Sequence, residues 1–252
     1  MIHRRWGLVN DGSFTQYRRF VEPVRRADGS PAVLRLAPPE ELDAAEWFSG
    51  RGVVRVLEID RAAGAVLLER ALPGTHLREL VPERDEEATA VIASLMQSMW
   101  RAPGANCAFP SVREWGRFLE PGSRAAETYF ELCDSMDELV VLHGDLHHEN
   151  VLRSGDGWVA IDPKGVIGEP AYEAGALLRN PIPGLLDVPS PGRLARRRSD
   201  LLCERLGLDA ARVRGWGYSQ AVLAAAWAVD DREDPSFWLA VADVLEPLTR
   251  ER

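Results

Sequence analysis

One stretch constrains the fold of this chain more than any other: residues 143–150, with the sequence HGDLHHEN, followed by Asp162 twelve residues beyond Asn150. Between them, residues 151–153 and 158–161 have the composition of short strands, and the turn-forming residues 154–157 separate them. Pairing across that turn sets Arg153 opposite Trp158 and Asn150 opposite Ile161. The sequence therefore predicts a hairpin whose open end brings Asn150 and Asp162 together.

The residue types at this end of the hairpin suit phosphoryl transfer from ATP. That reaction needs a carboxylate that orients the attacking hydroxyl group, and Asp145 would supply it. It also needs oxygen ligands for Mg²⁺, and Asn150 and Asp162 would supply them together. A zinc site at His143 and His147 is a weaker interpretation, because a glycine and turn-forming residues interrupt any helix that would carry both ligands. An ordinary polar loop is the other alternative.

Composition narrows the class of protein further. The chain has 252 residues, which is long enough for one domain or two lobes with a substantial core. It has no apolar run long enough to span a membrane, and its N-terminus lacks the apolar core of a signal peptide. Three widely spaced cysteines indicate reduced thiols, so a cytoplasmic location is expected. The net charge of −9 argues against a nucleic-acid partner and is compatible with a cationic small substrate. The composition does not indicate an oligomeric state.

The first 71 residues are predicted to form a small β-rich lobe that binds a nucleotide. The expected strands cover residues 14–24, 32–36, 53–59 and 65–69, and a short helix is expected over residues 38–48. Residues 7–13 contain two glycines, and they form either a phosphate-covering loop or an ordinary turn. Pro73-Gly74 interrupts the pattern, and the lobe boundary is placed between residues 71 and 72.

Residues 72–252 are predicted to form a larger, mainly helical lobe. Apolar residues at helical spacing between Pro82 and Trp100 indicate a core-facing helix. Further helices are expected over residues 115–136, with a break at Pro121-Gly122, and over residues 171–178, 191–206, 213–229 and 237–248. The predicted fold class is therefore α+β with two lobes.

Three segments together resemble a known family. These are residues 140–152 (VVLHGDLHHENVL), residues 160–165 (AIDPKG) and residues 168–172 (GEPAY). Shorter matches over most of the chain include Leu178-Arg179-Asn180-Pro181. The chain resembles the aminoglycoside/hydroxyurea antibiotic resistance kinase family, which includes streptomycin 6-phosphotransferases.

The resemblance implies a two-lobed, protein-kinase-like fold and ATP-dependent phosphorylation of a hydroxyl group on a small molecule. It implies that Asp145 is the catalytic base and that Asn150 and Asp162 bind Mg²⁺. Backbone groups near Glu69 and Ala71 would hold the adenine of ATP.

Two positions depart from the family pattern. Arg35 stands in the third strand where the family has a lysine that contacts the ATP phosphates, and an arginine positions phosphates differently. Its helix partner is left open among Glu41, Asp43 and Glu46. The only lysine of the chain, Lys164, lies two residues after Asp162, where its ammonium would contact a phosphate or the substrate. Glu173 stands where the family more often has an aspartate, at a position expected to support the catalytic loop.

The acceptor is expected to bind between Asp145 and the C-terminal helices. Trp227, Asp230 and Asp231 combine an aromatic face with carboxylates, which suits amino or guanidinium groups, and His147 is assigned to the same site. A solvated helix end with a buried tryptophan is the alternative. A streptomycin-like aminocyclitol is the first candidate acceptor. There are two competing hypotheses. The protein is a kinase of another small hydroxyl metabolite, or it is a nucleotide-binding pseudokinase weakened by Arg35.

Overall fold

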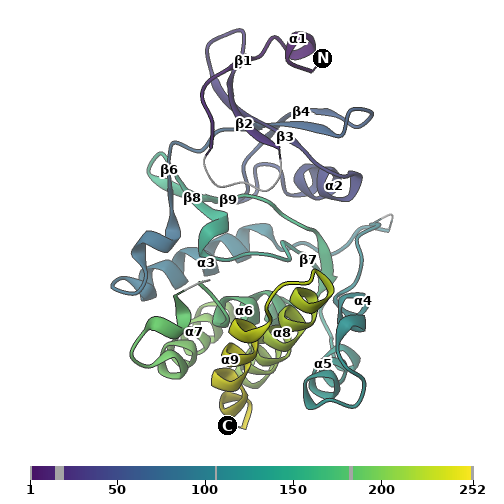
Figure 1. Cartoon of the computed structure of the whole chain (residues 1–252), viewed down its shortest axis with the longest axis vertical. Helices are drawn as coiled ribbons and strands as arrows, with labels where there is room; N and C mark the ends of the chain where they lie inside the picture. Colours follow the sequence, from purple (N-terminus) through teal and green to yellow (C-terminus); the bar gives the residue numbers. More distant parts are fainter. Residues whose placement is uncertain (1, 15–19, 106, 182–183, 251–252) are drawn as a thin grey trace.

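The structure is a computed structural model, which describes residues 2–14, 20–105, 107–181 and 184–250. The chain forms a lobe built on an antiparallel sheet and, below it in Figure 1, a larger lobe built mainly from helices. The predicted α+β, two-lobed plan is confirmed.

The small lobe has a five-stranded sheet in the order β1-β2-β3-β5-β4, with neighbouring strands antiparallel. Its elements are α1 (Ile2–Trp6), β1 (Val9–Asn10), β2 (Val21–Arg25), β3 (Pro31–Leu36), α2 (Pro39–Phe48), β4 (Val56–Asp60) and β5 (Ala65–Glu69).

Strand β3 shows how the sequence brings a charge to the cleft between the lobes. Because side chains alternate between the two faces of a strand, Ala32 and Leu34 pack into a small core on one face of the sheet. Val33 and Arg35 point to the opposite face, where both line a cavity. Arg35 thus lies beneath the sheet, buried to all but 7% of its surface.

Two predicted strands of the small lobe begin later than expected, and one helix was not predicted. The strand expected from residue 14 begins at Val21 in its described part, since residues 15–19 lie outside the described residues. The strand expected from Val53 begins at Val56, because Val53 and Val54 pair with Ala160 of the hairpin in the other lobe. Helix α1 was not predicted, since five residues are too few to show a periodic pattern.

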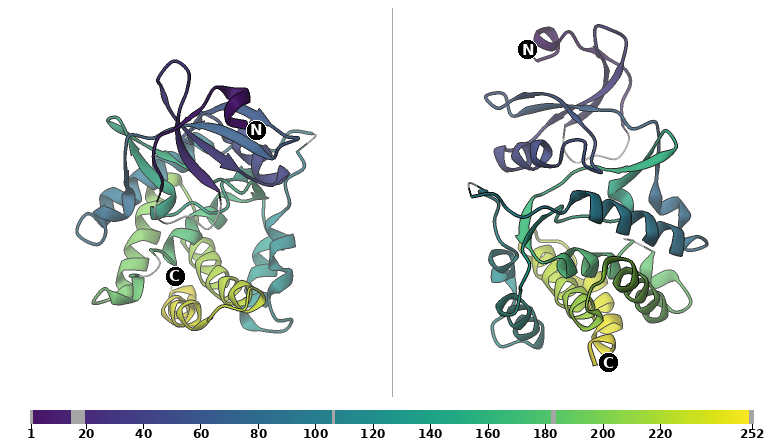
Figure 2. Two further views of the ribbon diagram at one scale, coloured as in Figure 1. Left: turned by 45° about the horizontal axis from the view of Figure 1, so that its top comes forward. Right: turned by 180° about the vertical axis from the view of Figure 1, so that it is seen from behind.

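The large lobe contains most of the helices. Its helical elements are η1 (Leu77–Leu80), α3 (Asp85–Met99), α4 (Val112–Trp115), η2 (Gly116–Phe118), α5 (Arg124–Asp134), η3 (His148–Asn150), α6 (Pro170–Leu178), η4 (Leu185–Asp187), α7 (Pro191–Leu206), α8 (Ala210–Asp230), α9 (Ser236–Leu245) and η5 (Glu246–Arg250). Every predicted helix is present, although the segment expected over 115–136 is divided into α4, η2 and α5. Figure 2 shows from behind that α3 lies between the sheet and the remaining helices.

Short strands connect the helices to the cleft. They are β6 (Pro73–His76), β7 (Val140–Leu142), β8 (Val151–Ser154), β9 (Gly157–Ala160) and β10 (Val166–Gly168). Strands β8 and β9 form the predicted hairpin with Arg153 opposite Trp158, and the Ile161 amide donates to the Asn150 carbonyl at 2.9 Å. The predicted register is therefore confirmed.

The predicted boundary after residue 71 falls between β5, in the sheet of the small lobe, and β6, which pairs with β8. It stays a prediction. The three cysteines are unpaired, as expected. Within the described ranges, no helix combines the length and the apolar character that crossing a membrane requires.

Candidate active site

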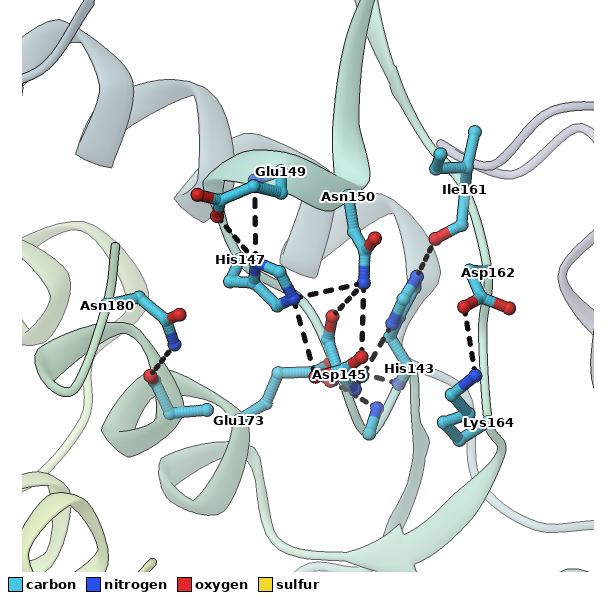
Figure 3. A network of polar contacts seen from close by, with 12 residues as sticks. His143, Asp145, His147, Glu149, Asn150, Ile161, Asp162, Lys164, Glu173 and Asn180 are labelled. Carbon is cyan, nitrogen blue, oxygen red and sulfur yellow. Dashed lines mark hydrogen bonds and ion pairs between the residues drawn. The ribbon is translucent and has the colours of Figure 1, made fainter. Parts of the chain in front are cut away.

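His143 connects residues 143–150, called the catalytic loop below, to Ile161, which lies between β9 and Asp162. Its Nε2 donates to the carbonyl of Ile161 at 3.0 Å, and its Nδ1 accepts from the amide of Asp145 at 3.3 Å (Figure 3). Burial lowers the pKa of this imidazole to about 4, which keeps the ring neutral and suits this pattern of one donor and one acceptor. Asp145 and Asp162 are thereby held on either side of one fixed ring.

Asp145 is oriented by Asn150, the other end of the HGDLHHEN loop. The amide nitrogen of Asn150 donates to the Asp145 carbonyl at 2.8 Å and to its carboxylate at 3.2 Å. Burial alone would raise the pKa of Asp145, but the hydrogen bond and charge of His147 outweigh burial and lower it to about 2. The side chain is 34% exposed, so the ionised carboxylate is accessible from outside the loop.

His147 lies between two carboxylates. Its Nδ1 is 2.9 Å from Glu149 and its Nε2 is 3.6 Å from Asp145. Burial opposes its charge, yet the two carboxylates raise its pKa to about 9, and Arg78 pairs with the far side of Glu149 at 3.1 Å. Both ring nitrogens are therefore engaged within the loop, and the predicted contact of His147 with substrate stays a prediction.

Glu173 of α6 supports the start of the loop, as the sequence suggested. One carboxylate oxygen accepts from the amide of Gly144 at 2.8 Å, and the other accepts from the amide of His143 at 3.2 Å and from Trp100 Nε1 at 3.0 Å. Burial raises the pKa of this carboxyl group to about 7 despite the three donors. The longer glutamate side chain thus still reaches the loop backbone.

A cavity of about 390 Å³ lies between the lobes, a size typical of small-molecule sites. It contains five of the predicted residues: Arg35, Glu69, Ala71, Asn150 and Asp162. Its apolar walls come from both lobes, with Val33, Val54 and Leu68 from the small lobe and Leu152 and Ile161 from the large one. Two apolar walls that face each other suit a flat purine base.

Glu69, which lines this cavity, is tied to Arg55 through its backbone amide, which donates to the Arg55 carbonyl at 2.9 Å, and through its side chain. The Glu69 carboxylate turns away and accepts from the Arg55 amide at 2.9 Å and from its guanidinium at 2.7 Å. Arg70 pairs with Asp11 at 2.8 Å, which ties this segment to the connection after β1. Residues 7–13 contain β1, and Phe14 after them lines the cavity; their role as a phosphate-covering loop stays a prediction.

Four charged groups meet around Asp162, at the end of the cavity where the ATP phosphates are predicted to bind and which is called the phosphate end below. Arg35 forms ion pairs with Glu41 of α2 and with Asp162. Lys164 lies 2.9 Å from Asp162 and 3.6 Å from Glu41. Glu41 is therefore the helix partner that the sequence left open.

The other two candidates for that role lie elsewhere. Asp43 and Glu46 both pair with Arg61, each at 2.5 Å, at exposed positions.

The side chains present fit a magnesium ion bound with a nucleotide. Mg²⁺ prefers oxygen ligands and takes only one or two from a protein, with water and phosphate oxygens completing the set. Asn150 uses its amide nitrogen within the loop, which leaves its oxygen for a metal beside the carboxylate of Asp162. No cluster of three or more His, Cys, Asp or Glu ligands occurs in the described part of the chain, so a closed protein-only metal cage is absent there.

Asp162 is also held in an uncommon backbone conformation. Its φ of 62° is left-handed, which an aspartate adopts more readily than most residues. Such conformations cluster at functional sites.

The acceptor was predicted to bind near the C-terminal helices, and that placement stays a prediction. The turn between α8 and α9 lies at the end of the lobe that faces the sheet (Figure 1). Trp227 packs edge-on against Trp115, with ring centroids 5.9 Å apart, and Trp115 in turn lies against Gly144. The structure thus connects Trp227 to the catalytic loop, whereas Asp230 and Asp231 are exposed at the end of α8.

Sequence reasoning missed three residues around Asp145. Glu149 orients His147, Trp115 covers Gly144, and Arg179 is an electrostatic neighbour of Asp145. Arg179 and Glu149 had a visible signal, since both lie in segments that resemble the family. The position of Trp115 depends on a contact that no spacing rule gives.

Comparisons with known proteins agree with this geometry. The family model described as aminoglycoside/hydroxyurea antibiotic resistance kinase matches residues 5–232. A streptomycin 6-kinase from Streptomyces glaucescens is 34% identical over 90% of this chain and 80% of its own length. A hydroxyurea phosphotransferase from Kitasatospora aureofaciens is 36% identical over 96% of this chain and 76% of its own length.

The fold comparison reaches a more distant protein. The chain is similar to a thermostable aminoglycoside phosphotransferase APH(4)-Ia solved with ADP and hygromycin B, with a TM-score of 0.65 and 14% identity over 99% of this chain and 96% of that one. The fold is therefore protein-kinase-like.

The family model covers most of the chain, and both relatives are named for phosphoryl transfer to small molecules. The protein is accordingly a phosphotransferase that acts on a hydroxyl group of a small molecule and uses ATP. This chain belongs to the aminoglycoside/hydroxyurea antibiotic resistance kinase family.

Proposed function

We propose that the protein phosphorylates a hydroxyl group of an aminoglycoside, with a streptomycin-like aminocyclitol as the first candidate. The observation that carries this proposal is the position of Asp145. Its ionised, partly exposed carboxylate is fixed by Asn150 and His147, next to a cavity lined by Asn150 and Asp162.

Each residue has a distinct part in the proposed reaction. Asp145 orients the acceptor hydroxyl and accepts its proton, while the charge of His147 keeps Asp145 ionised. Asn150 and Asp162 hold Mg²⁺, which neutralises charge on the phosphates when it is bound. Arg35 and Lys164 place two further cations at the phosphate end of the cavity.

The choice of acceptor draws on the acidic end of α8 and on the relatives. Exposed Asp230 and Asp231 suit the guanidinium and amino groups of a streptomycin-like molecule, and Trp227 adds an aromatic face nearby. The Streptomyces relative is named as a streptomycin 6-kinase. Another small hydroxyl compound is the alternative acceptor, and the Kitasatospora relative is named for hydroxyurea.

The proposal is tested by ATP turnover with a panel of acceptors that includes streptomycin and hydroxyurea. Asp145→Asn should lower turnover by about 10²–10⁴-fold, the usual contribution of a general base, and leave Mg²⁺–ATP binding intact. Asp156→Asn, at an exposed position in the β8–β9 turn, is the matched control and should retain turnover. Absence of Mg²⁺–ATP binding would rule out a kinase, and binding without turnover on any acceptor would favour a pseudokinase.

A further inference from the structure

Arg179, at the end of α6, is a buried cation whose charge is not neutralised by a hydrogen-bonded partner. It is 8% exposed, and its Nε atom is buried with no hydrogen-bond partner. In the part of the chain that the structure describes, no hydrogen bond or ion pair of its guanidinium to a protein group is found. The guanidinium stacks on Trp238 of α9, with its central carbon 5.3 Å from the ring centroid.

Buried arginines with a structural role look different in this same protein. Arg198, fully buried, pairs with Asp85 and donates to the backbone carbonyls of Leu177 and Asn180. Burying a guanidinium without such partners costs several kcal/mol, on the order of the desolvation of one ion. A buried polar group left in this state requires an explanation, and a ligand that completes its hydrogen bonds is one.

The position of Arg179 places that ligand on the acceptor side of Asp145. Arg179 does not line the nucleotide cavity, whereas Asn150 and Asp162 do. Among carboxylates, Asp145 is the one whose charge acts on Arg179, and burial lowers the pKa of the guanidinium. Trp238, on which it stacks, belongs to the α8–α9 end of the lobe, where the acceptor is proposed to bind.

We propose that Arg179 determines acceptor specificity by binding an oxygen atom next to the hydroxyl group that Asp145 activates. The ligand group is a carbonyl, carboxylate or vicinal hydroxyl oxygen, because a guanidinium only donates hydrogen bonds. An amino group at this position would be repelled by the cation. This inference rests on the proposed function and adds an orientation to it: amines of the acceptor lie toward Asp230 and Asp231, and an oxygen-bearing edge lies at Arg179.

The first test needs no mutation. Acetohydroxamate and N-methylhydroxylamine both carry an N-hydroxyl group, but only acetohydroxamate has a carbonyl oxygen beside it. Calorimetry on the ADP-loaded protein should show at least about tenfold tighter binding of acetohydroxamate, as expected for one hydrogen bond to a charged group. Equal affinities would overturn the proposal.

Variants then assign the preference to Arg179. Arg179→Gln should remove the discrimination between the two compounds, and Arg179→Lys should retain part of it. Arg153→Gln is the matched control, since Arg153 also stacks on a tryptophan at 5.3 Å but on the β8–β9 hairpin, and it should preserve the discrimination. A preference that survives in Arg179→Gln would overturn the assignment.

Kinetics distinguish this role from two others. Arg179→Gln should raise KM for the acceptor that is turned over by about tenfold or more, with a smaller change in kcat. A loss confined to kcat would mean that Arg179 acts on the transferred phosphoryl group or on Asp145 instead, and would overturn the proposal. Failure of wild-type turnover would count against the proposed function rather than against Arg179.

A stability measurement tests the alternative that Arg179 only stabilises the fold. Arg179→Met keeps a long side chain against Trp238 while removing a buried charge that has no paired carboxylate, so the melting temperature should stay level or rise. A fall of about 5 °C or more would indicate a structural ion and contradict the proposal.

Discussion

At the scale of single residues, the catalytic loop is held by groups whose charge states are set by burial and neighbours. His143 stays neutral, His147 is charged and Asp145 is ionised, although all three belong to one eight-residue stretch. The motif determines which residues are present. Their protonation depends on burial, on the mutual charges of Asp145 and His147, and on Glu149.

Glu173 allows a prediction about pH and stability. Burial raises its pKa from 4.5 to about 7, so the folded state binds this proton more tightly than the unfolded chain does. The stability that protonation of Glu173 adds to the free energy of unfolding is therefore fully present below about pH 4.5. It is lost as the pH rises through 7. From pH 5 to pH 8, the wild type should lose on the order of 3 kcal/mol relative to Glu173→Gln.

Urea unfolding at several pH values measures this difference. Exposed Glu127→Gln on α5 is the control and should follow the wild type at every pH. A difference between the wild type and Glu173→Gln that does not change with pH would show that Glu173 stays ionised, held by its three hydrogen bonds.

At the scale of elements, α6 positions both Glu173 and Arg179, and it is itself positioned by close packing against α8. A Cβ atom at Gly175 would lie 2.7 Å from Trp216 Cβ and 2.8 Å from the backbone nitrogen of Gly217. Backbone atoms cannot move aside cheaply, so only glycine fits at this crossing. Trp216 in turn packs edge-on against Tyr172, with ring centroids 5.0 Å apart.

Gly175→Ala should therefore destabilise the protein by about 2 kcal/mol or more, as overpacking does. It should also weaken catalysis by shifting Glu173 and the catalytic loop. Gly215→Ala on α8 is the matched control, because its Cβ would meet the flexible end of Leu132 at 3.1 Å and the Thr128 methyl group at 3.6 Å but no backbone atom, and it should be close to neutral. Thermal unfolding compares the two variants, and equal melting temperatures would refute the packing argument.

At the scale of the whole molecule, charges and backbone pairing join the two lobes around the cleft. Arg35 and Glu41 come from the small lobe, while Asp162 and Lys164 follow the hairpin of the large lobe. The backbone of Val54 also donates to Ala160 at 3.0 Å. The position of the phosphate end therefore depends on how the lobes meet.

This arrangement predicts that replacing Arg35 and replacing Lys164 have different effects on turnover. Arg35→Lys should preserve turnover within about threefold or raise it, because a lysine still reaches Glu41 as the family pattern has it. Lys164→Ala should lower turnover by about tenfold or more, since an ammonium near the phosphates is lost. Steady-state kinetics with ATP measure both effects.

Arg61→Lys is the control for Arg35→Lys, because Arg61 also pairs with carboxylates of α2 but at an exposed position away from the cavity. A loss beyond tenfold in Arg35→Lys alone would show that the site has adapted to arginine. Unchanged kinetics in Lys164→Ala would return Lys164 to an ordinary surface role.

The sequence by itself determined the elements and the motif, because both depend on local order along the chain. Apolar periodicity located α3, and the turn residues set the β8–β9 register, which brings Asn150 and Asp162 to one end of the hairpin. Alternation along β3 was also sufficient to send Arg35 and Val33 to one face.

Only the tertiary structure decided which distant groups meet. It selected Glu41 over Asp43 and Glu46, joined Val53 and Val54 to the other lobe, and placed Trp115 against Gly144. It also left Arg179 buried within reach of the charge of Asp145, with no hydrogen bond from its Nε atom. Such contacts depend on how helices and lobes pack in three dimensions, and charge states follow from the resulting burial, so no spacing along the chain encodes them.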